Sequence, residues 1–484
     1  MELNPGRCYE AMKARDARFD GTFFVGVSST GIYCRPVCTV RMPMRRNCSF
    51  FANAASAERA GYRPCLRCRP EIAPGHAPAV SPVDAVKTAA CWAAARIQAG
   101  ALNDGAFEKL AAEYGLSSRQ LRRVVEREYG VTPVELAQTR RLLLAKQLLT
   151  DSSLPMTQVA SASGFGSLRR FNHLFKSRYG LSPGALRRRV EPIETDAITL
   201  KLAYRPPMNW PHLLGFLSGR GAAGVEHAEG SRYWRTLRVG SLRGWLGAEP
   251  VDNQHALRLS IAPALLPALT PLLARVRALF DLDANPPVIE THLAADARLR
   301  KLLRRQTGLR VPGAIDGFEL ALRAVLGQQV TVKAATTLFG RFAEAFGETA
   351  STPCAALRFH SPSAELIADA GRQRIINLGL TQKRAETVLL LARACAEGLK
   401  LEPEQDADAV MQRLIEIPGI GNWTAHYIAM RALRWPDAFP HTDLGLMKAL
   451  NLRKPKEILA VAEAWRPWRA YAALHLWESL KSGG

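Results

Sequence analysis

The sequence predicts a multidomain protein with two small α+β domains, an all-α domain containing a duplicated helix-turn-helix, and a mainly α-helical C-terminal domain. Six of the nine cysteines lie in the first 75 residues, a glycine-punctuated helical pattern occurs twice between residues 84 and 190, and alternating apolar segments give way to helical periodicity near residue 284. A chain of 484 residues is also too long for one hydrophobic core. We therefore expect four domains, at residues 1–75, 84–190, 193–283 and 284–484.

The composition favours a nucleic-acid partner over a membrane. The formal net charge is +22 and the isoelectric point is near 10.0, which suits a polyanionic partner. The most apolar run, residues 259–274, is short and interrupted by three prolines, so we expect no membrane span. The first residues lack the apolar core of a signal peptide, and an odd number of cysteines argues for reduced thiols and metal sites. We expect a bacterial cytoplasmic protein associated with the nucleoid.

Four cysteines are spaced like the ligands of a metal ion. They form Cys-x3-Cys, a gap of 26 residues and Cys-x2-Cys, with a proline beside each pair: Cys34, Cys38, Cys65 and Cys68. Thiolates with this spacing can converge on zinc in a tetrahedron, at about 2.3 Å per Zn–S bond. Buried free cysteines are the alternative, which two proline-flanked pairs in so short a segment disfavour. We predict one Zn²⁺ held by four thiolates, with a linker of proline, glycine and alanine following at residues 73–82.

The stretches around these cysteines, residues 30–36, 47–52 and 61–65, resemble the N-terminal domain of the Ada methyl-response proteins. The resemblance implies that Cys34 is a zinc ligand and also the nucleophile that takes a methyl group from a DNA phosphotriester. Zinc would keep its sulfur as a thiolate at neutral pH. Thr39 stands where the best-known relative has a basic residue. The resemblance places DNA contacts at Thr30, Thr39, Arg41 and Arg63.

A duplicated pattern between residues 107 and 183 predicts two helix-turn-helix motifs. Each copy has a short helix, a turn at Gly115 or Gly164, a serine N-cap, a basic helix and a Tyr-Gly-x-Ser/Thr-Pro ending, and a long helix at 136–149 joins the copies. The pair resembles the AraC-type DNA-binding module. Residues 117–190 hold fourteen Arg and Lys against four Asp and Glu, so the second helices should contact phosphates and base edges. Their cations are Arg119, Arg122, Arg123, Arg169 and Arg170.

The third region, residues 193–283, reads as a small α+β domain. Apolar residues alternate as in strands at 198–202, 235–239 and 256–260, and helical patterns cover 210–218 and 264–280. We identify no candidate catalytic or binding residues in the sequence of this region. Its three tryptophans are expected to be core residues: Trp210, Trp234 and Trp245.

In the C-terminal region, an apolar helical run stops at Pro418, and Gly419-Ile420-Gly421 makes a turn before a second helix begins near Asn422. The free backbone N–H groups at the start of that helix suit a phosphate. By itself this is only an αα-hairpin with a glycine turn. Together with Trp-Thr-Ala and the later Pro-His-Thr-Asp-Leu-Gly loop, it resembles the helix-hairpin-helix DNA glycosylases, most closely the AlkA-type methyladenine glycosylases. This resemblance extends from about residue 198 to the C-terminus.

The glycosylase resemblance implies a set of functional residues. Asp443 would be the catalytic carboxylate, Gly419 and Gly421 would bind the DNA backbone, and the hairpin could seat a monovalent cation on its carbonyl oxygens. Gln329 stands where the family has an apolar wedge; it could still fill the gap in the base stack, with Val330 as a core residue. The aromatic residues expected to line the base pocket are Trp423, Tyr427 and Trp477.

The leading hypothesis is a DNA alkylation repair enzyme. Its glycosylase would be a DNA-3-methyladenine glycosylase II, which excises alkylated purines by hydrolysis of the N-glycosidic bond. Trp423 replaces the lysine of lyase relatives, so the enzyme should be monofunctional. The zinc domain would make the chain a methylation-responsive regulator that binds promoter DNA and works with RNA polymerase. The alternative is a transcriptional regulator whose C-terminal half only binds damaged DNA.

Overall fold

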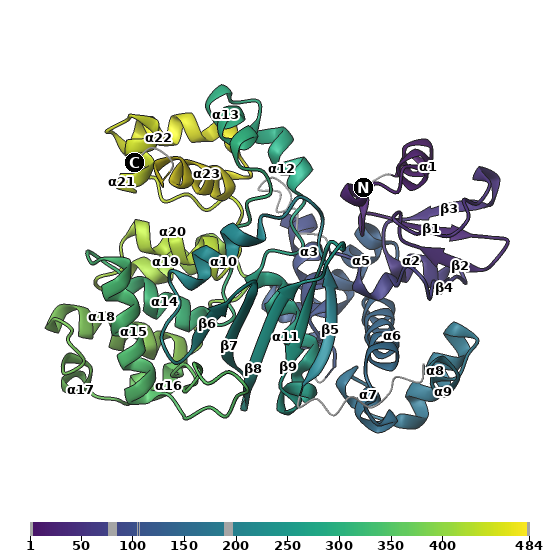
Figure 1. Ribbon diagram of the computed structural model, residues 1–484, viewed down its shortest axis with the longest axis horizontal. Helices are drawn as coiled ribbons and strands as arrows, with labels where there is room; N and C mark the ends of the chain where they lie inside the picture. Colours follow the sequence, from purple (N-terminus) through teal and green to yellow (C-terminus); the bar gives the residue numbers. More distant parts are fainter. Residues whose placement is uncertain (1–2, 76–84, 104, 106, 188–196, 482–484) are drawn as a thin grey trace. The chain divides into compact units, whose positions relative to one another are not determined.

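The computed structural model describes residues 3–75, 85–103, 105, 107–187 and 197–481 and divides into two compact units. The first unit comprises residues 1–206, 251–274 and 282–285, and the second comprises 207–250, 275–281 and 286–484 (Figure 1). Most of the predicted linker, residues 76–82, lies outside the described residues. In the described part, no helix is long and apolar enough to cross a membrane. The division into four domains stays a prediction.

The cysteine-rich region folds around a four-stranded sheet in the order β3-β1-β2-β4. Strand β1 pairs antiparallel with β2 and β3, and β2 pairs parallel with β4. Cys8 and Cys48 pack with Phe23 and Val25 in its core, and burial raises the pKa of both thiols, so they behave as ordinary core cysteines. The elements are α1 (Pro5–Lys13), β1 (Phe24–Val27), β2 (Ile32–Cys34), β3 (Cys48–Phe51), α2 (Ala54–Arg59) and β4 (Arg63–Pro64).

The duplicated region forms the two predicted helix-turn-helix motifs. Their second helices, α5 and α8, begin after the N-cap residues Ser117 and Ser167 and end at glycines in the left-handed conformation. The central helix is longer than predicted, because Thr132 forms a capping box and Pro133 occupies the first turn. The helices are α3 (Ala85–Gln98), α4 (Phe107–Glu113), α5 (Ser118–Tyr129), α6 (Pro133–Asp151), α7 (Met156–Ala162), α8 (Leu168–Tyr179) and α9 (Pro183–Leu186).

Helix α2 of the cysteine-rich region packs directly on the helix-turn-helix motifs. Its Ala55 belongs to the same buried cluster as Leu121 and Val125 of α5. At the end of α5, the carbonyl oxygen of Tyr129 accepts from Asn53 Nδ2 at 2.9 Å and from Ser56 Oγ at 3.1 Å. The two regions therefore share one apolar core and a set of polar contacts within the first unit.

A buried carboxylate, Glu58 of α2, lies at the centre of this interface. It accepts hydrogen bonds from three hydroxyl groups on three elements: Tyr33 of β2 at 3.1 Å, Thr139 of α6 at 2.8 Å and Tyr179 of α8 at 3.3 Å. Arg178 donates to its backbone oxygen rather than to its carboxylate. Burial therefore prevails over these hydrogen bonds and raises the pKa of Glu58 to about 7.

The predicted strands of the third region are present in both units. In the first unit, β5 (Ile198–Ala203) pairs antiparallel with β9 (Ala256–Ile261). In the second unit, β6 (Glu226–Glu229), β7 (Arg232–Val239) and β8 (Leu242–Pro250) form an antiparallel meander beside α10 (Trp210–Ser218).

The structure corrects two expectations for this region. The single helix predicted at 264–280 is wrong, because three prolines restrict it: a 3-10 helix, Pro263–Ala268, precedes α11 (Leu269–Leu279). Trp210 and Trp245 are buried as expected, whereas Trp234 is only half-buried and packs against Trp245.

The rest of the second unit is helical, as predicted. Its core includes a buried ionic network, in which Arg235 of β7 and Arg323 of α14 both pair with Glu226 and Glu319. The helices are α12 (Pro286–Leu293), α13 (Ala297–Arg305), α14 (Gly317–Leu326), α15 (Val332–Phe346), α16 (Ala364–Ala368), α17 (Arg372–Ile376), α18 (Gln382–Ala396), α19 (Ala407–Ile415), α20 (Asn422–Arg431), α21 (Leu444–Leu450), α22 (Pro455–Ala462) and α23 (Arg469–Lys481).

Replacing Glu58 by glutamine should change how stability depends on pH. The pKa of Glu58 is about 7 in the folded protein against an ordinary value of 4.5, so the folded state holds a proton that the unfolded state has lost between these values. The free energy of unfolding should therefore fall as pH rises through this window, by on the order of 1 kcal/mol per pH unit. In Glu58→Gln this contribution should be absent. Urea unfolding of both proteins at pH 5 and pH 8 measures it, and equal pH dependence would contradict the assignment.

Candidate functional site

The hairpin between α19 and α20 requires glycine at one of its two glycine positions. Gly419 has φ +94°, and a β-carbon there would lie 2.1 Å from Thr387 Oγ1 of α18, which itself donates to the carbonyl oxygen of Pro418 at 2.8 Å. Gly421 has φ −98°, and no described residue lies within 4 Å of a β-carbon built there, so neither its backbone nor its described neighbours require glycine. Helix α20 has no side-chain N-cap bond, which leaves its first N–H groups available to an anion.

Asp443 is the N-cap residue of α21, and three N–H donors hold its carboxylate. Oδ1 accepts from the backbone N–H of Leu446 at 2.9 Å and from the indole of Trp477 at 2.8 Å. Oδ2 accepts from the indole of Trp423 at 2.8 Å. Because each carboxylate oxygen has two lone pairs, Oδ2 keeps one acceptor position. Gly445 makes room for this arrangement, since a β-carbon there would lie 2.8 Å from Oδ1.

The three predicted pocket aromatics therefore contribute in different ways. Trp423 and Trp477 direct their N–H groups at Asp443, a role that the sequence did not suggest. The rings of Trp423 and Tyr427 stack on each other, 5.3 Å apart and nearly parallel, which leaves each ring only its outer face. Burial raises the pKa of Tyr427, but Arg431, which donates to its hydroxyl at 2.8 Å, and nearby Arg220 outweigh burial and lower it overall.

The loop between α14 and α15 presents Gln329 to solvent. Gln329 has φ +54°, a strained conformation for a residue with a side chain, and is exposed. The neighbouring Gln328 holds the loop to the hairpin: its Nε2 donates to the carbonyl oxygen of Gly419 and to Thr424 Oγ1, each at 3.0 Å. The expectation that Val330 is a core residue is wrong, because it is 36% exposed on this loop. The sequence motif contained Gln328 but gave no sign of its role.

His426, which lies near the hairpin, is a poor candidate for proton transfer. Burial, His441 and Arg469 lower the pKa of His426 to about 4, so His426 is neutral at physiological pH. It packs between Trp435 and His441. Within the described residues, this leaves Asp443 as the carboxylate with donors on both oxygens beside the hairpin.

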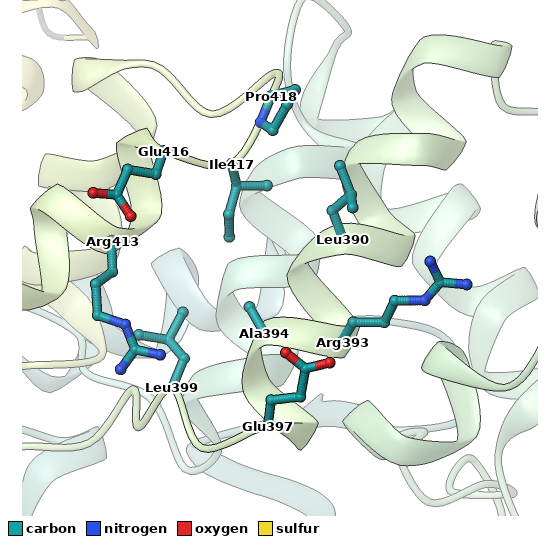
Figure 2. Close-up of a pocket in the computed structure, with 9 residues that line it drawn as sticks. All are labelled: Leu390, Arg393, Ala394, Glu397, Leu399, Arg413, Glu416, Ile417 and Pro418. Atoms are coloured by element: carbon teal, nitrogen blue, oxygen red, sulfur yellow. The ribbon is translucent and has the colours of Figure 1, made fainter.

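A groove of about 350 Å³ lies behind the hairpin, between α18 and the end of α19. Figure 2 shows apolar side chains such as Leu390 and Ile417 in its middle, with Arg413 and Glu416 on one side and Arg393 and Glu397 on the other. Neither Asp443 nor the residues that hold it contribute to the groove, so it is distinct from the carboxylate site.

In the first unit, the four predicted ligands come together. The sulfur atoms of Cys34, Cys38, Cys65 and Cys68 all lie within 4.8 Å of one another. Hydrogen bonding among them raises the pKa of Cys34 and Cys68 and lowers that of Cys38, to about 7, and of Cys65. Without a metal ion, the four sulfur atoms therefore share protons among themselves, and a divalent cation would displace these protons on binding. The donor set fits Zn²⁺.

A residue that the sequence did not single out, Arg35, positions this cluster. Its backbone N–H donates to Cys68 Sγ at 3.3 Å, and its side chain donates to the carbonyl oxygen of Cys68 at 3.0 Å and to the buried Asp20. Cys34 is only 5% exposed, whereas Cys68 is half-buried, so exposure does not favour Cys34 over the other ligands as the methyl acceptor. The acceptor role of Cys34 stays a prediction.

The four predicted DNA contacts lie on the segments that carry the cysteines. Thr30, Thr39 and Arg41 are exposed, whereas Arg63 is half-buried in β4. The backbone N–H of Arg63 donates to the carbonyl oxygen of Gly31, which fixes the loop beside β2. Their contact with DNA also stays a prediction.

Four family models match successive stretches of the chain. Residues 7–71 match the metal binding domain of Ada, 110–189 a helix-turn-helix domain, 199–316 the AlkA N-terminal domain, and 322–466 the HhH-GPD superfamily of base excision DNA repair proteins. A probable bifunctional transcriptional activator/DNA repair enzyme AlkA of Mycobacterium tuberculosis is 37% identical over 487 residues, covering 98% of this chain and 96% of the relative.

Two further matches concern the C-terminal half. The DNA-3-methyladenine glycosylase 2 of Escherichia coli is 37% identical over 277 residues, 57% of this chain and 95% of that protein. The structure of a 3-methyladenine DNA glycosylase from Archaeoglobus fulgidus superposes with a TM-score of 0.50 at 20% identity, covering 57% of this chain and 96% of that chain, which shows the fold.

The fold, the cysteine cluster, the hairpin and the family matches together define the class of the protein. It is a base-excision DNA glycosylase joined to a regulator that has a metal-binding domain and a helix-turn-helix domain. The chain belongs to the family of bifunctional transcriptional activator/DNA repair enzymes of the AlkA type. The predicted fold class, enzyme class and zinc site are confirmed.

Replacing Gly419 by alanine should weaken both stability and DNA binding. A side chain at φ +94° is strained and would collide with Thr387, so the hairpin must shift, at a cost on the order of 1–3 kcal/mol. Thermal unfolding and affinity for undamaged duplex DNA measure the two effects.

Gly421→Ala is the matched control, because the protein leaves room for its β-carbon. This variant should keep the wild-type melting temperature, and any loss of DNA affinity would then report close approach of the DNA backbone. An unchanged melting temperature for Gly419→Ala would contradict the steric assignment.

Proposed function

We propose that the C-terminal half is a monofunctional glycosylase that releases alkylated purines of the 3-methyladenine type from duplex DNA by hydrolysis. The N-terminal half would accept methyl groups from DNA phosphotriesters and make the protein a methylation-responsive regulator. The observation that carries the proposal is Asp443, whose carboxylate has three fixed N–H donors and one acceptor position left. The carboxylate of Asp443 lies beside the N-terminus of α20, whose free N–H groups suit a phosphate.

Asp443 would act on the sugar rather than on the base. Cleavage of an N-glycosidic bond passes through an oxocarbenium-like sugar, which a fixed carboxylate stabilises electrostatically. The remaining acceptor position on Oδ2 can orient or deprotonate the attacking water. Because Trp423, Trp477 and Leu446 already hold the carboxylate, little reorganisation is needed when charge develops.

Other residues would bind and extrude the damaged nucleotide. The outer faces of Trp423 and Tyr427, together with Trp477, offer stacking surfaces for an electron-poor alkylated purine. Gln329, exposed at the tip of its loop, would fill the gap in the base stack. Gly419 and Gly421 would contact the DNA backbone, and the hairpin carbonyls would seat a monovalent cation.

In the N-terminal half, Cys34 would attack the methyl carbon of a methylated phosphate. The new S–CH₃ bond forms as the C–O bond breaks, and the phosphodiester anion leaves. Zinc, when bound, keeps the cysteine sulfurs as thiolates. Thr30, Thr39, Arg41 and Arg63 would hold the DNA phosphates, and Arg35 keeps the loop of Cys68 in place.

Methylation of Cys34 would remove negative charge beside DNA and so strengthen promoter binding. The methylated protein would then recruit RNA polymerase as an activator. We also propose that the protein works in the bacterial cytoplasm, associated with the nucleoid.

Asp443→Asn should lose at least about 10²-fold in release of methylated purines from alkylated duplex DNA. Asparagine still caps α21, but it removes the charge and turns an N–H₂ group toward an indole donor. Asp406→Asn, at the N-cap of α19, is a control for capping alone and should keep full activity. If the wild-type protein released no base, the C-terminal half would be a binding module.

Methylated wild-type protein should bind its promoter DNA at least about tenfold more tightly than the unmethylated protein, with the difference shrinking as salt increases. Cys48→Ser should show the same gain, because Cys48 lies in the core away from the cluster. Cys34→Ser should show none. Equal affinity of wild-type protein before and after methylation would remove the regulatory mechanism.

A further inference from the structure

The two helix-turn-helix motifs contain second helices that can be compared residue by residue. Helices α5 and α8 both have twelve residues, a serine N-cap and a terminal glycine with φ +68°. Counting from Ser117 and Ser167 therefore aligns their positions. The inward positions confirm the alignment, because Leu121 corresponds to Phe171 and both are fully buried.

The outward positions at the helix N-termini differ in chemistry. In a helix-turn-helix, this end of the second helix meets the base edges. On α5 the aligned positions are three guanidinium groups and a half-buried serine: Ser118, Arg119, Arg122 and Arg123. On α8 the aligned positions are all exposed and carry four different residue types, of which only Arg169 repeats the residue of α5: Leu168, Arg169, Asn172 and His173.

These two sets suit different parts of DNA. Three arginines on one face can all bind phosphates, and as base readers they would all favour guanine, so together they carry little sequence information. On α8, by contrast, arginine pairs with guanine, asparagine with adenine, and an apolar side chain with the methyl group of thymine. Leu168 is 37% exposed, so its side chain is accessible to the methyl group of a thymine.

Both helices are also held firmly enough to present these faces. The end of α8 is fixed to α2 through Tyr179 and Arg178, and the end of α5 is fixed through the carbonyl oxygen of Tyr129. Fixed presentation is needed because hydrogen bonds to base edges tolerate little displacement.

We propose that the second motif reads the operator sequence through Leu168, Arg169 and Asn172, whereas the first motif clamps the backbone through Arg119, Arg122 and Arg123. The DNA ligand is thus a duplex with a mixed, adenine- and guanine-containing half-site under α8. This inference rests on the regulatory part of the proposed function.

The test compares Asn172→Ala with Arg122→Ala, which occupy aligned positions on exposed faces. The probes are the consensus duplex that the full-length wild-type protein selects from a random pool and a scrambled duplex of the same length. Asn172→Ala should lower the ratio of the two affinities on the order of 10- to 100-fold and leave scrambled-duplex binding nearly unchanged. Arg122→Ala should weaken both duplexes equally and reduce the salt slope by about one.

The opposite pattern, in which Arg122→Ala abolishes discrimination and Asn172→Ala does not, would overturn the proposal. So would a random-pool selection that yields no consensus. Asn172→Arg, which makes α8 resemble α5, should raise affinity for the scrambled duplex while losing discrimination. A consensus site whose affinity is unaffected by methylation of Cys34 would end the regulatory proposal and leave this assignment intact.

Discussion

The second unit depends on how one carboxylate is held. Asp443 accepts hydrogen bonds from Trp423 of α20, from Trp477 of α23 and from the backbone of α21, so three helices meet at its two oxygens. Because the donors are rigid indoles and a backbone N–H group, the carboxylate cannot turn without breaking a bond. The same contacts connect it to the hairpin, since Trp423 lies in the first turn of α20. A DNA backbone seated at that turn would therefore have a fixed relation to the carboxylate.

The first unit depends on a different carboxylate, Glu58, which is buried in the protein interior. Among the described residues, no cationic side chain donates a hydrogen bond to the Glu58 carboxylate; three hydroxyl groups donate to it instead. Its pKa of about 7 shows that burial costs more than these hydrogen bonds recover. Tyr33, one of the donors, directly precedes Cys34 on β2, and Tyr179, another, ends α8. One buried side chain thus connects the strand of the cysteine cluster with the helix that we assign to sequence reading.

Several parts of the protein could be predicted because their signals are local. The spacing of Cys34, Cys38, Cys65 and Cys68 indicated their convergence, and serine N-caps with terminal glycines indicated both helix-turn-helix motifs. Other features depend on contacts between segments far apart in the sequence. The helix expected at residues 264–280 is interrupted because its prolines prevail over its apolar pattern. Val330 is exposed in the loop between α14 and α15, although its apolar side chain favours a core position.

The sequence by itself determined the order of the folds, the four metal ligands and the hairpin, since each has a short-range pattern with a direct physical cause. The identity of Asp443 as the candidate carboxylate came from the resemblance to the glycosylase family. Only the tertiary structure decided what these residues contact. Gln328 and Thr387 hold the hairpin from other helices, and the indoles of Trp423 and Trp477 donate to Asp443 rather than only offering their faces. The direction of a side chain depends on the packing of distant elements, and no local pattern contains that information.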